Sequence, residues 1–124
     1  HLGETGVDEQ SAYLFRYDSG AFARMSSATR TKTAQRATIS GTEGSIEIPG
    51  FWHAQEVIVN GETESHPHLG NGYSHEAVAV AEALAGGETE CAEVSLAETL
   101  DLAGTLDEIR AQWGLTYPAD EVCS

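Results

Sequence analysis

Hydrophobic and polar residues alternate along the first half of the chain, which is the pattern of half-buried β-strands. Residues 9–17 and 21–28 form a first pair of such segments, joined by the turn-forming sequence Asp18-Ser19-Gly20. Further alternating segments follow at 35–40, 45–48, 55–59 and 62–66. The Asn60-Gly61 pair before the last segment predicts a tight hairpin, and the polar character of that segment predicts a sheet edge.

The hydrophobic pattern becomes helical in the second half of the chain, where it predicts two helices. Ser74 is expected to cap the first helix and Gly86-Gly87 to end it. The segment 95–98 is a capping box for the second helix, which Gly114 ends and Pro118 prevents from resuming. This order predicts an α+β domain: an open, mostly antiparallel sheet of about six strands with two helices packed on one face.

Length and charge limit the number of domains and the kinds of binding partner that the chain can have. A chain of 124 residues fits a single domain, covering residues 1–124. The formal net charge is -14, and Arg110 is the only Lys or Arg after residue 60, so nucleic acid and anionic membranes are disfavoured as partners. No apolar run is long enough to span a membrane. Cys91 and Cys123 lack the spacing of a metal site, which favours reduced thiols in a cytoplasmic protein.

The segment 66–77 concentrates chemically active side chains between the strands and the helices. His66, His68, His75 and Glu76 are of the types that bind zinc, but the second histidine of an H-E-x-x-H motif is missing. We therefore expect no metal ion, and two roles stay open for the histidines: structural or exposed residues, or a contact with a substrate. A serine directly before His75 cannot align with it as nucleophile and base, so no catalytic residue is assigned.

Two aromatic residues are candidates for the wall of a binding site. Trp52 follows the Pro49-Gly50 break and sits between strands, where it is either a core aromatic or part of a cavity wall. Tyr73 stands just before the expected N-terminus of a helix, where backbone N–H groups favour a polar or anionic ligand group. The simpler interpretation of Tyr73 is a ring stacked beside a helix cap.

Six segments in order resemble the C-terminal half of the Gfo/Idh/MocA oxidoreductases. They are residues 5–8, 41–46, 72–77, 84–88, 95–100 and 109–118. Within that family the chain is most similar to the branch of trans-1,2-dihydrobenzene-1,2-diol dehydrogenases and D-xylose dehydrogenases. The chain begins without Met and in a loop-like sequence, so we expect it to be part of a longer protein.

The resemblance implies a C-terminal substrate-binding and oligomerisation domain of an NAD(P)-dependent dehydrogenase. The family binds NAD or NADP in an N-terminal Rossmann domain, and its glycine-rich fingerprint, lysine and Asp-x-x-x-His pair lie upstream. None of these motifs has a matching position here. The resemblance therefore implies a chain that neither binds the cofactor nor transfers hydride alone, and that forms a homo-oligomer through its sheet face.

The resemblance also assigns three residues to the substrate site. Trp52 matches a tryptophan that lines the pocket in the dihydrodiol branch, and Tyr73 and His75 fall in a segment close to that pocket. The branch has a Phe-Asp pair where this chain has Pro67-His68, so a sugar, polyol or diol is expected without a named substrate. The alternative hypothesis is a non-enzymatic sheet-and-helix module that recruits a protein partner.

Overall fold

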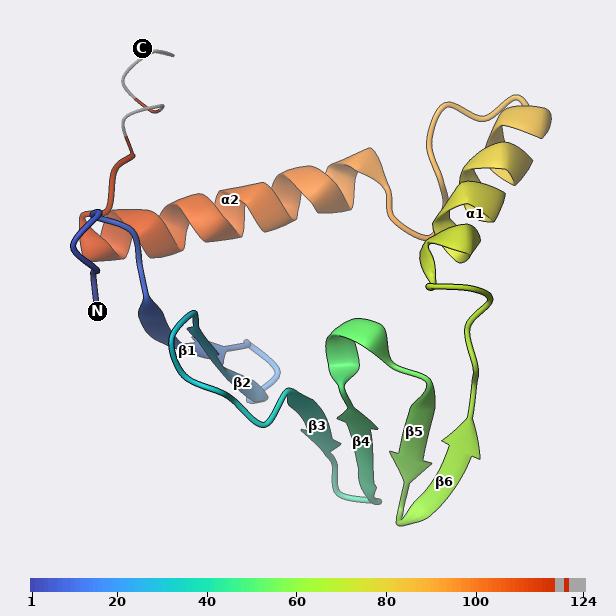
Figure 1. Cartoon of the computed structure of the whole chain (residues 1–124), viewed down its shortest axis with the longest axis horizontal. Helices are drawn as coiled ribbons and strands as arrows, with labels where there is room; N and C mark the ends of the chain where they lie inside the picture. Colours follow the sequence, from blue (N-terminus) through green and yellow to red (C-terminus); the bar gives the residue numbers. More distant parts are fainter. Residues whose placement is uncertain (118–119, 121–124) are drawn as a thin grey trace. The chain divides into compact units, whose positions relative to one another are not determined.

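The computed structural model describes residues 1–117 and 120, which fall into two compact units. Residues 1–34 and the described part of 117–124 form the first unit, and residues 35–116 form the second (Figure 1). Pro118, expected to prevent a helix, and Cys123, expected to be a reduced thiol, lie outside the described residues. Cys91 carries a free thiol.

The first unit is built on an antiparallel hairpin. Strands β1 (Gln10–Arg16) and β2 (Phe22–Ala28) pair along their whole length. Gly20 adopts a φ of 86°, and the Tyr17 N–H donates to the Ala21 carbonyl at 2.9 Å, which closes the turn. The hairpin predicted from the alternating pattern is confirmed.

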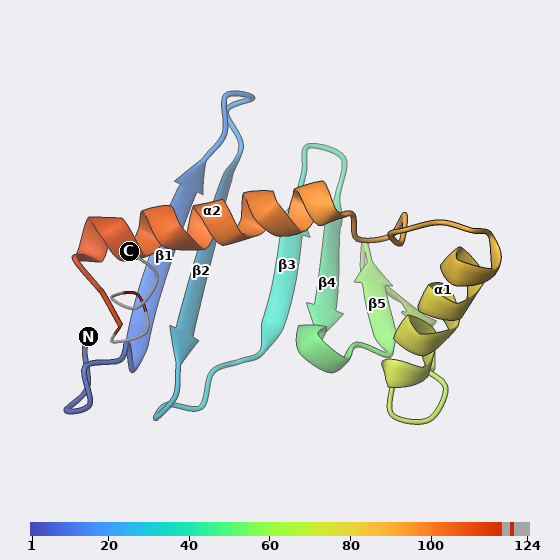
Figure 2. The same cartoon turned by 90° about the horizontal axis from the view of Figure 1, so that it is seen from above.

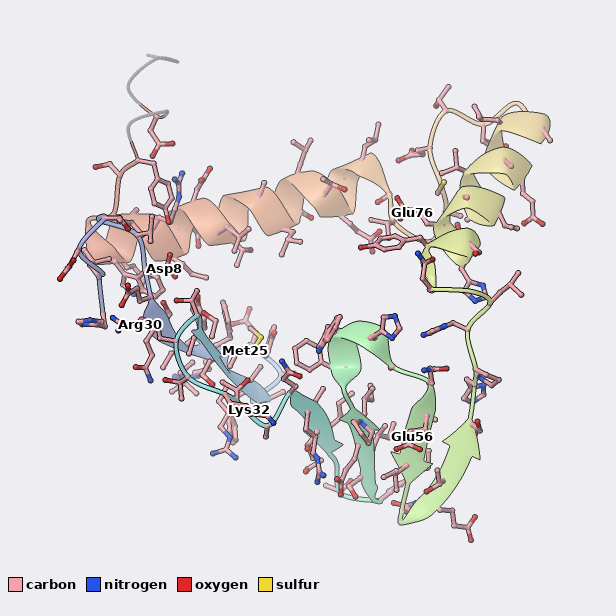
Figure 3. All side chains as sticks on the ribbon, viewed as in Figure 1. Asp8, Met25, Arg30, Lys32, Glu56 and Glu76 are labelled. Atoms are coloured by element: carbon pink, nitrogen blue, oxygen red, sulfur yellow. The ribbon has the colours of Figure 1, made fainter. Side chains whose placement is uncertain are left out.

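Asp8 connects the segment before β1 to Ser11 in β1 and to Tyr117 near the end of the chain. Its carboxylate accepts hydrogen bonds from the Ser11 hydroxyl at 2.9 Å and from the Tyr117 hydroxyl at 3.2 Å. Ser11 is 8% exposed, so the shorter bond is partly shielded from water. The Ser11 bond, with a smaller contribution from Tyr117, holds the pKa of Asp8 below its usual value of 3.8. Figure 3 shows Asp8 at the N-terminal side of β1.

The second unit contains a four-stranded antiparallel sheet and both helices. Its elements are β3 (Arg36–Ser40), β4 (Ser45–Pro49), η1 (Phe51–His53), β5 (Glu56–Val59), β6 (Glu62–Ser65), α1 (Tyr73–Ala85) and α2 (Leu96–Trp113). The strands pair in chain order, and Figure 2 shows β3, β4 and β5 in succession. Strand β6 lies at the edge and is exposed throughout, as its polar sequence predicts.

The predicted α+β class is confirmed, with one refinement. The six strands divide into a two-stranded and a four-stranded sheet, instead of one open sheet. The packing of both helices on one face stays a prediction. The Asn60-Gly61 hairpin is confirmed by φ values of 53° and 89°, which suit a type I′ turn between β5 and β6.

The strand register places apolar side chains on one face of β3, β4 and β5, three strands of the four-stranded sheet. Because side chains alternate along each strand and opposed residues share a face, six residues fall together. They are Ala37, Ile39, Ile46, Ile48, Val57 and Val59. Ile39 is 60% exposed, so this apolar face is incompletely covered within the chain. We call these six residues the apolar sheet face.

Three of the four predicted helix ends are confirmed. The Ser95–Glu98 capping box is present, and Gly87 and Gly114 adopt φ values of 78° and 64° at the two C-terminal ends. The predicted Ser74 cap is wrong. Helix α1 begins two residues earlier than a Ser74 cap implies, with Gly72 as N-cap at a φ of 92°, and the Asn71 side-chain oxygen accepts the Tyr73 N–H at 3.3 Å. Asn71 thus serves the first turn that Ser74 was expected to cap.

The carboxylate of Asp8 makes the stability of the chain pH-dependent. Its folded pKa is depressed, so its contribution is present above the unfolded value and is lost as the pH falls through the folded value. We expect Asp8→Asn to lower the free energy of unfolding by up to about 1 kcal/mol near neutral pH, and less in acid. Chemical denaturation at several pH values measures this difference. A penalty that stays constant as the pH falls from neutral to well below 3.8 would contradict the assignment.

Candidate functional site

A pocket lies where η1 meets the segment that leads into α1. Its volume is about 370 Å³, and its walls come from residues 52–54 and from the segment between His68 and Glu76. Trp52, Tyr73 and His75, the three residues that the family resemblance assigns to a substrate site, all line it. The structure therefore brings the three residues together, although they come from two segments. Their contact with a substrate stays a prediction.

Trp52 forms one wall of the pocket and is not a core residue. Gly50, with a φ of 55°, turns the chain from β4 into η1 and so presents the indole at this point. The Trp52 side chain is 67% exposed, and its Nε1–H donates to the Gln35 side-chain oxygen at 3.3 Å. Of the two roles left open by the sequence, the structure supports the cavity wall.

His53 is a pocket residue that the sequence analysis did not single out. Its Nε2 lies 3.2 Å from the Asn71 carbonyl oxygen, and its Nδ1 lies 3.1 Å from Nε2 of His68. The His53 and His68 rings meet edge to face, with centroids 4.3 Å apart. The one available signal was its position directly after Trp52, in the break between two strands.

The predicted histidine cluster is only partly assembled. His68, His75 and Glu76 line the pocket, whereas His66 pairs with Glu64 at 3.5 Å in an exposed position. Within residues 1–117 and 120, no group of three or more His, Cys, Asp and Glu side chains is placed to hold a metal ion. In the same described part of the chain, no helix is long and apolar enough to cross a membrane.

The first turn of α1 supplies the polar groups of the second wall. Nε2 of His75 accepts the Leu69 N–H at 3.3 Å, so a neutral His75 carries its proton on Nδ1 and can donate from there. Tyr73, which is 73% exposed, adds a hydroxyl. Glu76 adds a carboxylate in the first helical turn, where the helix dipole favours it (Figure 3).

These groups suit a small, neutral ligand that carries hydroxyl groups. The Trp52 indole offers an apolar surface, the kind on which carbon-bound hydrogens of a ring pack. Tyr73, His75 and Glu76 offer both donors and acceptors to hydroxyl groups. The Glu76 carboxylate disfavours an anionic ligand because like charges repel at close range.

Comparison with known proteins places this chain beside a class of oxidoreductases. No protein-family profile matches the chain. The curated proteins to which it is similar are dehydrogenases, and this similarity extends over nearly its whole length.

Three of these relatives are each named trans-1,2-dihydrobenzene-1,2-diol dehydrogenase. The Xenopus tropicalis protein is 36% identical over 128 residues, covering 94% of this chain and 39% of the relative. The Mus musculus protein is 34% identical over 97% of this chain, and the Homo sapiens protein is 30% identical over 95%, each again with 39% of the relative covered. The predicted resemblance to this branch is confirmed. The chain spans about 39% of the length of these relatives.

The exposure of Trp52 generates a test of its role. Truncating a core tryptophan costs about 3–5 kcal/mol. Because Trp52 is 67% exposed, we expect Trp52→Ala to lower the free energy of unfolding by less than about 1 kcal/mol. Chemical denaturation measures this, with Leu115→Ala at a buried apolar position of the same unit as the comparison. A loss above about 3 kcal/mol would make Trp52 a core residue after all.

Proposed function

We propose that this chain is the C-terminal substrate-binding and dimerisation domain of an NAD(P)-dependent dehydrogenase of the Gfo/Idh/MocA family. The observation that carries the proposal is the pocket formed by Trp52, Tyr73 and His75 in a chain similar to dehydrogenases. The three residues were assigned to a substrate site from the sequence and line one pocket. The protein is proposed to act in the cytoplasm.

The proposed division of labour leaves the chemical step to the preceding part of the protein. NAD or NADP would be bound by an N-terminal Rossmann domain, which would also supply the groups that move the proton during hydride transfer. This chain would bind and orient the substrate through Trp52, Tyr73 and His75, and none of its residues is assigned a catalytic role. Alone it is expected to be inactive.

The proposed substrate is a neutral sugar, polyol or diol. The relatives are named for a dihydrodiol, which has two neighbouring hydroxyl groups on a partly unsaturated ring. Such a compound could stack on the Trp52 indole while its hydroxyl groups bond to Tyr73 and His75. Pro67-His68 replaces the Phe-Asp pair of that branch, so the precise substrate need not be the dihydrodiol.

Titration of the chain with a diol and with a cofactor tests this proposal. In a Trp113→Phe background Trp52 is the remaining tryptophan, so we expect trans-cyclohexane-1,2-diol to change its fluorescence saturably. NADH should give no saturable signal. Trp52 itself is the reporter, so Tyr73→Phe and His75→Ala serve as binding variants, each expected to weaken the diol affinity about three- to tenfold.

Two results would contradict the proposal. Saturable NADH binding would overturn the division of labour, because the cofactor site would then lie in this chain. A diol affinity that both pocket variants leave unchanged would remove the pocket as the substrate site. His66→Gln is the matched control, since His66 lies outside the pocket lining.

Self-association is the second part of the proposed function. The apolar sheet face contains six apolar residues, and Ile39 on it is 60% exposed. Burial of such a face against a second copy would remove apolar surface from water at about 25 cal/mol per Å². The apolar sheet face is therefore the proposed contact between subunits.

Light scattering tests the subunit contact. We expect the chain to self-associate at high concentration, and Ile39→Lys to weaken this association at least about tenfold, because a charge would be buried in the contact. Thr38→Lys, on the opposite face of the same strand, is the control and should leave association unchanged. A monomer at high concentration, or equal effects of the two variants, would argue against the assigned face.

A further inference from the structure

We propose that His53 and His68 form a positioning pair, which joins the two walls of the pocket and is intact only while both imidazoles are neutral. The proposal deepens the proposed function, because it concerns the same pocket. It rests on the hydrogen bonds of the two rings and on a ring nitrogen of His68 that has no partner.

The pair connects segments that are remote in the chain. His53 ends η1, directly after Trp52, whereas His68 and Asn71 belong to the segment that leads into α1. The His53 ring contacts both of these residues. Its Nδ1 lies 3.1 Å from His68 Nε2, and its Nε2 lies 3.2 Å from the Asn71 carbonyl oxygen. The wall that carries Trp52 is thereby tied to the wall that carries Tyr73.

The position of each proton follows from the partners. The Asn71 carbonyl oxygen can only accept, so Nε2 of His53 must carry a hydrogen. In a neutral His53, Nδ1 is then an acceptor, and the hydrogen between the rings belongs to Nε2 of His68. In a neutral His68, Nδ1 therefore carries a lone pair and no hydrogen.

An additional proton conflicts with this arrangement. If the bond between the rings is kept, the position between them already holds one hydrogen, so the added proton must reside on Nδ1 of His68. That atom is buried and has no hydrogen-bond partner. A buried N–H without an acceptor is unfavourable. A second added proton would put two charged rings in contact, and these would repel each other. Protonation is therefore expected to open the bond between the rings.

The His68 ring lies beside Gly72, the residue that caps helix α1. An added Cβ on Gly72 would lie 3.7 Å from the His68 ring, so the ring packs against the backbone at the helix N-cap. The other titratable groups that line the pocket are Tyr73, His75 and Glu76. Replacement of His68 leaves these three residues in the chain, so a comparison of variants separates the contribution of His68 from theirs.

The test measures diol affinity against pH in the 124-residue chain with the Trp113→Phe background, using trans-cyclohexane-1,2-diol as the probe. We expect the affinity to fall about tenfold as the pH decreases from about 7.5 to about 5.5. His68→Gln keeps a donor toward His53 but does not titrate. It should bind the diol more tightly than His68→Ala at neutral pH and lose most of the decline.

Two further variants complete the comparison. His68→Ala removes the donor and should bind about three- to tenfold more weakly at neutral pH. His66→Gln removes an exposed histidine outside the pocket and should behave like the parent chain at every pH. A His68→Ala variant that binds normally, or a His68→Gln variant with the full pH dependence, would overturn the pair.

A ligand-free measurement separates this proposal from the proposed function. Long-range ¹H–¹⁵N spectra report which ring nitrogen carries the hydrogen, and we expect the Nε2–H form for both His53 and His68 at neutral pH. His68→Ala should shift the Trp52 indole resonance, and His66→Gln should not. If no diol binds but these spectra agree, only the proposed function fails. An Nδ1–H form of His53 would overturn the pair itself.

Discussion

The pocket depends on one imidazole that is bonded on both of its nitrogens. His53 contacts the Asn71 carbonyl oxygen at 3.2 Å and His68 at 3.1 Å, and these contacts span fifteen to eighteen residues of chain. Along the chain, η1 and the start of α1 are separated by β5, β6 and the loop that follows. The shape of the pocket is thus set by side-chain bonds as well as by the sheet.

The local features of the chain were predictable because their causes lie within a few residues. Asn60-Gly61 adopts the positive φ values that its type of turn requires, and the Ser95–Glu98 box is complete within four residues. Gly87 and Gly114 end their helices for the same reason. In each case the residues that determine the turn or the helix end lie within a few positions of it in the sequence.

The errors and omissions arise where several local solutions compete or where partners are far apart. Ser74 and Asn71 are both suitable residues for the start of α1, and the helix takes the earlier start, with Gly72 at a φ of 92° and Asn71 accepting the Tyr73 N–H. His53 was overlooked because its partner His68 is fifteen residues away. For Trp52, by contrast, the family resemblance predicted a place in the pocket wall. The hydrophobic pattern alone left its role open between a core residue and a cavity wall.

The charge at the start of α1 bears on which ligand the pocket accepts. A free helix N-terminus attracts anions, because its backbone N–H groups and its dipole both favour negative charge. Here Asn71 already accepts the Tyr73 N–H, and the Glu76 carboxylate lies in the first turn. The positive end of the helix is therefore partly compensated from within the chain. The Glu76 carboxylate would repel a phosphorylated or carboxylated compound. A neutral diol could instead donate a hydrogen bond to it.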